Sequence, residues 1–517
     1  MQAADNLYQI VKNNAQEAAH KKILIDGKLT LNNQQFIEKV EAVASYLYQM
    51  GLQPQDKVAL LMTNSWQFVV NLFAINKLGG VAIPINTFLK EDEIAYILND
   101  SDAKFLFASG KLAPVATSLL IKSKIEKIIW VDEIPLTNDR NLDYAAIIEC
   151  PRSTAPEAKA HMDDLTLIIY TSGTTGKPKG AMLSFRNIYS NVTSSLQALS
   201  LTSGGARMIC YLPMFHSFTL TVSVILPIVA NSEIIIMRSI ATKRDFALLL
   251  KQVLLKRVKY FCGVPEVFSA LSRAQLPWYF YAFHAVQGFI CGGAPLAEET
   301  ILNFRAKFRR GTLLQGYGIS ECSPVVSVNT PAANRLGSVG KALPGYQVAC
   351  FTEELQVVAA DEIGELWVKG DCVMQGYYKR PEESAAAMVN GWFRTGDIGK
   401  IDRDGFIFII DRKKDLIINK GMNIYPREIE EVLYTHPKVN ACAVIGLKDK
   451  QENELPQAYI ELKEDSEGSE EEFKIFLRPH LAVFKLPRRI LFIKKMPRNA
   501  TGKILKRELR ELLQQDI

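Results

Sequence analysis

A loop rich in glycine, hydroxyl and lysine side chains is the first candidate for chemistry in this 517-residue chain. It follows the apolar run 165–170 and reads YTSGTTGKPKG from Tyr170 to Gly180. Glycines let the backbone turn its N–H groups toward phosphate oxygens, hydroxyls add donors, and ammonium groups offset negative charge. Because Pro178 follows Lys177, the loop lacks the Gly-Lys-Ser/Thr ending of a Walker A motif. We therefore predict a polyphosphate site, and the missing Walker A ending disfavours a GTPase or a motor ATPase.

Four later segments carry glycines, aromatic rings or charged side chains that suit a nucleotide. They read QGYGISE at 315–321, WFRTGD at 392–397, DRKKD at 411–415 and PRNATGK at 497–503. Together with the loop, and in the same order, they resemble the motifs of the adenylate-forming superfamily of acyl-CoA synthetases, peptide-synthetase adenylation domains and luciferases. The resemblance covers nearly the whole chain. It implies an enzyme that joins a carboxylic acid to the α-phosphate of ATP and then makes a thioester.

Attack of a carboxylate on the α-phosphate brings negative charges together, so a metal ion and a cationic side chain are expected there. The resemblance assigns Mg²⁺ to Glu321, with Thr171 as a second contact, and oxygen ligands suit that ion. It makes Lys503 the catalytic cation of the first half-reaction, with a solvated lysine in a basic tail as the alternative. The loop residues expected to hold the ATP phosphates are Thr171, Ser172, Gly173, Thr174, Thr175, Gly176 and Lys177.

Adenine and ribose are expected among the central motifs. Tyr317 would stack on adenine, and the glycines beside it would let the backbone approach the nucleotide. Asp397 can accept hydrogen bonds from both ribose hydroxyls, and Arg412 can donate to them. Outside its motif, Asp397 could equally be a turn residue. The residues implied at AMP are Gly292, Ala294, Gly316, Tyr317, Gly318, Ser320, Asp397 and Arg412, together with Lys503.

The second half-reaction is expected to use a different arrangement of the same chain. The resemblance implies that the C-terminal domain rotates about Lys414, which removes Lys503 and presents another face to the acyl-adenylate. Gly421 would lie on that face and line a tunnel for the thiol. His216 matches an aromatic-histidine segment at the junction of the acyl and thiol sites and is a further catalytic candidate. A core histidine held by the backbone is the alternative.

The elements that must position these residues alternate along the first three hundred positions. Residues 36–50 and 66–78 carry helical stripes, and residues 57–62 and 81–85 read as buried strands. This alternation predicts an α/β fold with parallel sheets covered by helices. Glycines punctuate short strands from Gly337 onward, which predicts a β-rich subdomain.

A compact α+β tail follows the charged segment near residue 411, and within it Pro426 marks a helix start. Earlier in the chain, Ser184 is expected to cap a helix just past the phosphate loop. We predict an N-terminal domain, 1–411, that binds ATP and the acyl substrate, and a small mobile C-terminal domain, 412–517. The active site is expected between the two domains.

The acyl pocket is expected from the segment near His216, residues 260–268 and the approach to 288–291, which are apolar and aromatic. We expect no charged side chain there that could neutralise the amino group of an amino acid. A medium- or long-chain fatty acid is therefore the favoured substrate, with its length undefined by the sequence. The alternative is a protein that holds ATP or acyl-adenylate without turnover, which the intact Lys503 and Glu321 oppose.

The thiol acceptor stays open between CoA and the phosphopantetheine of acyl carrier protein. The segment 485–510 concentrates positive charge, which could attract the acidic carrier protein, the phosphates of CoA or anionic lipid headgroups. Nucleic acid is not expected, since few aromatic residues lie between these charges. The basic residues are Lys485, Arg488, Arg489, Lys494, Lys495, Arg498, Lys503, Lys506, Arg507 and Arg510, opposed within the segment by Glu508.

The composition is that of a folded protein with reduced thiols. Nearly half the residues are hydrophobic, and the eight cysteines form no CxxC pair, so neither a zinc ribbon nor a disulfide framework is indicated. The N-terminus lacks the pattern of a signal peptide. Prolines interrupt the uncharged segment 208–230, which favours buried elements over a membrane span. We expect a cytoplasmic protein, with peripheral contact to the inner membrane face and a homodimer both left open.

Overall fold

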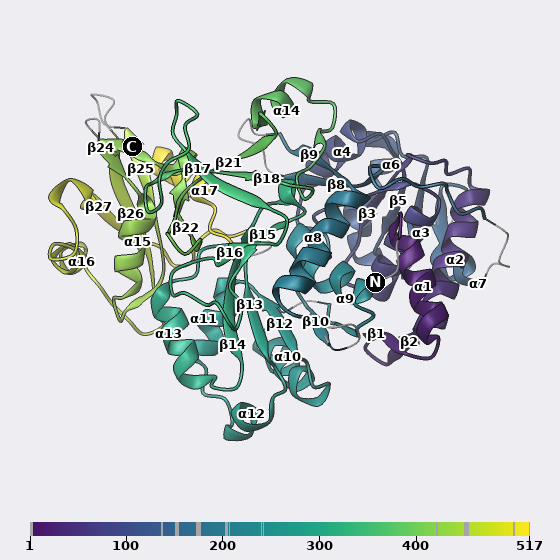
Figure 1. Cartoon of the computed structure of the whole chain (residues 1–517), viewed down its shortest axis with the longest axis horizontal. Helices are drawn as coiled ribbons and strands as arrows, with labels where there is room; N and C mark the ends of the chain where they lie inside the picture. The colour runs from purple at the N-terminus through teal and green to yellow at the C-terminus, as the bar shows by residue number, and fades with distance from the viewer. Residues whose placement is uncertain are drawn as a thin grey trace.

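The fold contains two large sheets, a smaller β-rich layer and a C-terminal α+β unit (Figure 1). The computed structural model describes residues 4–135, 138–149, 155–171, 177–201, 205, 207–238, 240, 242–419, 422–448, 454–499 and 502–515. The expected α/β fold is confirmed, because parallel-rich sheets are covered by helices and are followed by the predicted β-rich subdomain and C-terminal α+β unit.

The first sheet has eight strands in the order β19-β9-β8-β4-β3-β5-β6-β7. The strands from β8 to β7 are parallel, but β9 is antiparallel to both of its neighbours, β8 and β19, and so departs from the parallel sheet that the sequence suggested. The short connection 172–178 explains this, because a parallel neighbour would need a longer crossover. The strands are β3 (Lys57–Leu61), β4 (Val81–Pro84), β5 (Ala103–Ala108), β6 (Lys127–Trp130), β7 (Asn141–Asp143), β8 (Leu165–Thr171), β9 (Lys179–Ser184) and β19 (Gly376–Tyr377).

The second sheet has nine strands in the order β16-β15-β14-β13-β12-β10-β11-β1-β2. Its central strands, β14 to β1, are parallel, and their carboxyl ends meet at one edge, where ligands bind in open α/β sheets. The strands are β1 (Lys22–Asp26), β2 (Leu29–Asn32), β10 (Met208–Cys210), β11 (Ile234–Ile236), β12 (Tyr260–Gly263), β13 (Gly288–Cys291), β14 (Thr312–Gly318), β15 (Val325–Val328) and β16 (Lys341–Ala342).

Helices cover these sheets, and their starts follow local capping chemistry. The Ser184 side chain accepts from the backbone N–H of Asn187, so the predicted cap of α8 is confirmed. The predicted helices near 36–50 and 66–78 are also present. The α-helices are α1 (Leu7–Ala18), α2 (Asn33–Gln49), α3 (Trp66–Lys77), α4 (Glu91–Asp100), α5 (Ala113–Ala116), α6 (Leu119–Lys122), α7 (Tyr144–Glu149), α8 (Phe185–Ala198), α9 (Leu226–Val229), α10 (Lys243–Leu255), α11 (Pro265–Arg273), α12 (Trp278–Phe283) and α13 (Glu298–Lys307).

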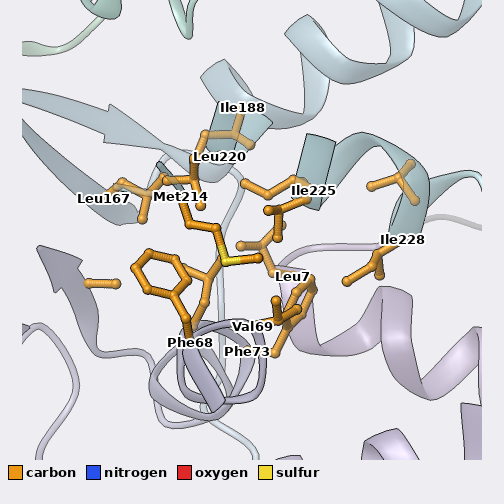
Figure 2. Packing of buried hydrophobic residues seen from close by; sticks show 14 of the residues in the cluster. Leu7, Phe68, Val69, Phe73, Leu167, Ile188, Met214, Leu220, Ile225 and Ile228 are labelled. Carbon is orange, nitrogen blue, oxygen red and sulfur yellow. The ribbon is translucent and has the colours of Figure 1, made fainter. Parts of the chain in front are cut away.

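The uncharged segment 208–230 is core. It forms β10, a loop, a π-helix over Thr219–Ile225 and α9, and its apolar side chains are buried. Figure 2 shows Met214 of this segment among side chains from α1, α3, β8 and α8. Among the described residues, no helix combines the length and apolar character needed to cross a bilayer. The cysteines in the described part of the chain are free and buried.

The β-rich layer is a five-stranded sheet that begins after β16. Four of its strands follow the order β17-β18-β21-β20, and the fifth strand, β22, also pairs with β21. The register places Asp397 on β21 opposite Arg412 on β22, which brings two of the predicted nucleotide contacts together. The elements are β17 (Gln347–Phe351), β18 (Gly364–Lys369), α14 (Pro381–Ala387), β20 (Met388–Val389), β21 (Trp392–Ile401) and β22 (Ile407–Arg412).

The C-terminal unit packs its helices on a three-stranded sheet, β25-β26-β27, around its own apolar cluster. The helix predicted at Pro426 is α15, whose first turn is acidic, as suits its dipole. The elements are β23 (Ile417–Asn419), β24 (Met422–Ile424), α15 (Pro426–Tyr434), β25 (Val439–Lys448), β26 (Glu454–Leu462), α16 (Glu470–Leu477), β27 (Arg489–Phe492) and α17 (Lys506–Gln515).

Candidate functional site

The two large sheets bring strand ends to one place. β8 ends at Thr171, and β14 ends just before a 3₁₀ turn, Ser320–Cys322. Thr171 Oγ1 donates to Oε1 of Glu321 at 3.3 Å, although 150 residues separate the two in the chain. The two candidate metal contacts are therefore adjacent.

A tyrosine that the sequence analysis missed contacts the same carboxylate. Tyr377 donates its hydroxyl to Oε1 of Glu321 at 3.1 Å. Burial and the Glu321 charge raise the pKa of Tyr377, so this hydroxyl keeps its proton. No local pattern signals the residue, because it reaches the site only through the pairing of β19 with β9. A carboxylate and two hydroxyls supply the hard oxygen atoms that fit Mg²⁺.

The predicted ribose contact is buried and already oriented. Asp397 is 3% exposed, and its Oδ2 accepts from the Tyr317 hydroxyl at 2.5 Å. Its Oδ1 lies 3.2 Å from Nε of Arg412. A carboxylate held from two sides by donors is fixed in place, which favours recognition of a rigid partner such as a sugar ring.

The glycines next to Tyr317 have a structural role in the strand itself. A Cβ on Gly318 would lie 2.1 Å from the backbone oxygen of Pro324, and one on Gly316 would lie 3.1 Å from that of Ser327. At Gly318 the absence of a side chain is therefore required by the packing of β14 against the segment that follows it, whether or not a nucleotide is bound.

Lys503 lies close enough to Asp397, Arg412 and Lys414 for their charges to affect it. Burial lowers the pKa of Lys503 to about 8, and the positive charge of Arg412 contributes. Burial also lowers the pKa of His216 to about 4, with a contribution from Lys503, so the imidazole is neutral near pH 7. Its Nδ1 lies 3.3 Å from the backbone nitrogen of Phe218, which donates to it.

The structure also describes the other predicted residues one by one. Ser320 Oγ lies 2.8 Å from Ser217 Oγ. Gly292 is buried directly after β13, where a Cβ would come within 3.2 Å of the Phe218 ring, and Ala294 is half-buried two residues on. The Lys177 side chain is exposed, with its Nζ 5.6 Å from the ring centre of Tyr96.

The predicted hinge residue lies at the start of the C-terminal unit. Lys414 is in a 3₁₀ turn, Lys413–Asp415, and burial lowers its pKa. Just before it, Asp411 accepts from the backbone N–H of Arg427 at the start of α15. The predicted phosphate contacts Ser172, Gly173, Thr174, Thr175 and Gly176, and the predicted tunnel residue Gly421, lie outside the described residues.

One charged side chain lies within the segments expected to form the acyl pocket, and it is already occupied by a partner. Glu266, the second residue of α11, lies within residues 260–268 and forms an ion pair with Arg498 of the C-terminal unit. Burial raises its pKa, while Arg498 acts in the opposite direction. Its Oε2 would lie 2.5 Å from a Cβ on Gly502. The carboxylate is thus paired with Arg498, whose guanidinium also donates to the backbone oxygen of Gly502, the residue before Lys503.

The basic segment 485–510 carries less unpaired positive charge than its sequence suggests. Carboxylates from elsewhere in the fold, and one on the same helix, neutralise half of its cations, because folding brings together residues that are distant in the chain. These ion pairs are Lys485–Glu428, Arg498–Glu266, Lys506–Glu430, Arg507–Glu511 and Arg510–Asp415. Arg488, Arg489, Lys494 and Lys495 are exposed.

Two models of known protein families match the chain. That of the AMP-binding enzymes matches residues 11–378, and that of the AMP-binding enzyme C-terminal domain matches residues 428–503. The chain is also 33% identical to a long-chain-fatty-acid–CoA ligase of Bacillus subtilis (strain 168), over 497 residues that cover 91% of this chain and 88% of that protein.

Solved structures share the fold over its whole length. An anthranilate CoA ligase in complex with anthranoyl-AMP matches with a TM-score of 0.91 and 25% identity, covering 100% of this chain and 98% of that one. The o-succinylbenzoate CoA synthetase of Bacillus subtilis, in complex with ATP and magnesium ion, matches with a TM-score of 0.84 and 27% identity, covering 98% and 99%. The chain belongs to the AMP-binding enzymes, the adenylate-forming superfamily.

Proposed function

We propose that this protein uses ATP to convert a medium- or long-chain fatty acid into an acyl-adenylate and then transfers the acyl group to the thiol of CoA. The observation that carries the proposal is the convergence of Thr171, Glu321, Asp397 and Lys503 on one site from four separate parts of the fold. The relative named as a fatty-acid ligase and the neighbours named as CoA ligases support it.

Each charged group of the site is assigned to one part of the substrates. Asp397 and Arg412 hold the ribose, and Tyr317 lies beside them. Glu321, with Thr171 and Tyr377 on its carboxylate, would hold Mg²⁺, which when bound offsets charge on the phosphate oxygens. The Lys503 ammonium bridges the substrate carboxylate and the α-phosphate, so that two anions can approach. His216 stays neutral and lines the acyl side of the site.

The proposed adenylation step is tested by exchange of labelled pyrophosphate into ATP. We expect exchange that depends on added fatty acid, measured across saturated acids from six to eighteen carbons, with anthranilate as an aromatic comparison. Faster exchange with anthranilate than with every fatty acid would redirect the proposal to aromatic acids. No exchange with any acid would refute the proposed activity.

CoA is the favoured acceptor because ion pairs neutralise much of the basic segment that could attract an acidic carrier. The exposed Lys494 and Lys495 keep acyl carrier protein as the second candidate. Thioester formation with CoA and with holo acyl carrier protein should be compared at low and moderate salt. Transfer to the carrier that is lost at moderate salt and in a Lys494→Glu/Lys495→Glu variant would favour the second candidate.

We also infer a division into domains 1–411 and 412–517, with rotation about Lys414 between the two half-reactions and Gly421 on the thiol tunnel. The boundary is supported by the end of the last strand of the β-rich layer at Arg412, after which a separate apolar cluster begins with Ile417. A cytoplasmic location also remains part of the proposal, with the oligomeric state to be measured by light scattering.

Activity should depend on pH through Lys503. The ammonium form offsets phosphate charge, and it is lost as the pH rises through the pKa of about 8. We expect kcat/KM for ATP in the exchange assay to be level below that pKa and to fall about tenfold per pH unit well above it. His216, with its pKa lowered to about 4, stays neutral throughout this range. The arginine of a Lys503→Arg variant stays charged at high pH, so the residual activity of that variant should not decrease above about pH 8. If the decrease were still present in this variant, the titrating group would be a residue other than Lys503.

Removing the charge of Glu266 should slow adenylation selectively. Glu266→Gln keeps the shape of the side chain but weakens its hold on Arg498, and therefore the placement of Lys503. Because the pair is partly buried, we expect the exchange rate to fall about tenfold. Thioester formation from supplied acyl-adenylate should not change. The matched control, Arg507→Gln, removes an exposed ion pair from the same unit and should affect neither step. Equal loss in both steps of Glu266→Gln would contradict this role.

A further inference from the structure

A short helix at the lower tip of the molecule in Figure 1 presents three large aromatic side chains to solvent. In α12, Trp278 is 74% exposed, Phe283 62% and Tyr279 47%. The rings gather on one side, since the Trp278 ring centre lies 6.0 Å from that of Phe283 and 6.3 Å from that of Tyr279. Large apolar side chains grouped in this way mark interaction surfaces more often than chance exposure.

The opposite side of α12 is firmly packed. Phe280 and Tyr281 contact the Phe308 ring, with ring centres 6.4 Å and 5.2 Å apart. The Arg310 guanidinium donates to the backbone oxygen of Ala282. The helix therefore has its own anchor in the fold, and its exposed rings do not contribute to that anchor.

Basic residues lie at the same edge of the sheet as α12. The chain passes through α12 just before β13, and the residues before the neighbouring strands β12 and β14 are basic. Backbone hydrogen bonds from Gln287 to Lys259 and from Thr312 to Gln287, at 2.8 and 3.0 Å, hold these three strand starts at one edge. The cations at this edge are Lys256, Arg257, Lys259, Arg309 and Arg310.

The segments that carry α12 and these five cations contain no acidic residue beside them in sequence, and the nearest acid at this edge, Glu233, is paired with Arg207. The sequence has no Asp or Glu between Asp245 and Glu266, and none between Glu266 and Glu298. We call the three exposed rings of α12 and the five cations the α12 surface. It differs from the segment 485–510, where carboxylates pair with half of the cations.

We propose that the α12 surface docks on a membrane that carries anionic lipids. Tryptophan, tyrosine and phenylalanine side chains insert at the level of the headgroups, and lysine and arginine beside them attract anionic lipids. An acidic protein partner would satisfy the cations but would leave three protruding rings to find pockets. Charge complementarity and the protruding rings together fit a lipid interface.

The position of the α12 surface leaves the candidate site accessible. It lies at the amino ends of the parallel strands, whereas Gly292 and Glu321 follow their carboxyl ends. Docking would thus hold the protein at the membrane without covering the site. If the proposed function is correct, this location gives access to fatty acids that partition into lipid; the docking itself does not depend on that function.

The test is co-sedimentation of the full chain with vesicles of phosphatidylcholine, with and without phosphatidylglycerol, in the absence of ATP and fatty acid. We expect binding to the anionic vesicles that weakens as salt rises. Trp278→Ser/Phe283→Ser should lower the partition coefficient about tenfold or more. The matched control, Ile121→Ser/Ile475→Ser, removes two exposed apolar side chains elsewhere, 89% and 57% exposed, and should bind like the unaltered chain.

A second pair of variants keeps the aromatic rings. Arg257→Glu/Arg309→Glu should also lower binding to anionic vesicles, whereas Lys494→Glu/Lys495→Glu should not. The unfolding temperature of each variant verifies that it folds. If the Trp278 and Arg257 variants bound anionic vesicles as well as the unaltered chain does, or if only the Lys494 variant lost binding, the proposal would be overturned. So would failure of the unaltered chain to bind vesicles, whether it instead binds acyl carrier protein or associates with itself through these rings.

Discussion

Lys503→Ala should reduce acyl-adenylate formation by about a thousandfold, the upper range for removal of one preorganised charge from a transition state. The structure gives the reason. Lys503 lies close enough to Asp397 and Arg412 to be affected by their charges. Burial has lowered its pKa, which indicates that its ammonium group is partly desolvated in this site. The measurement is the rate of exchange of labelled pyrophosphate into ATP at saturating fatty acid.

The same variant separates the two half-reactions. Thioester formation from supplied acyl-adenylate should stay within about threefold of the unaltered rate, because this step gains nothing from a cation at the α-phosphate. Lys495→Ala removes an exposed lysine of the same unit and serves as the matched control. If Lys503→Ala slowed both half-reactions to the same extent, a single arrangement of the domains would have to serve both.

Glu321→Gln should lower the adenylation rate by about a hundredfold or more, since an amide is a poor substitute for a carboxylate at Mg²⁺. The substitution keeps an oxygen that can accept from Thr171 and Tyr377, so the fold around it should persist. The loss therefore reports charge rather than shape. It is measured as the exchange rate over a range of Mg²⁺ concentrations, where half-saturation should move to higher concentration.

Two companion variants make this result specific. Tyr377→Phe removes one hydroxyl from the same carboxylate oxygen and should cost about fivefold to tenfold, in line with the loss of one hydrogen bond to a charged group. Glu353→Gln changes a carboxylate with an 82% exposed side chain and should leave the rate unchanged. A Glu321→Gln enzyme with the normal Mg²⁺ dependence would show that the metal is held elsewhere.

Local sequence determined most of the elements and the identity of the candidate site. Apolar runs such as 57–62 and the cap at Ser184 appear where they were predicted, because strand and helix periodicity and capping act over a few neighbouring residues. The motif residues also carry their chemistry locally. A carboxylate at Glu321 and a lysine in a glycine-containing turn at Lys503 can be recognised before any fold is known.

Tertiary structure decided which of these groups meet and which charges remain. Tyr377 reaches Glu321 only because β19 pairs with β9, and Glu266 reaches Arg498 only because the C-terminal unit lies against α11. The exposure of Trp278 could not be read from an aromatic run that would usually be assigned to the core. Each of these facts depends on contacts between elements far apart in the chain, whose pairing is fixed by the packing of the whole fold and is not encoded in local periodicity.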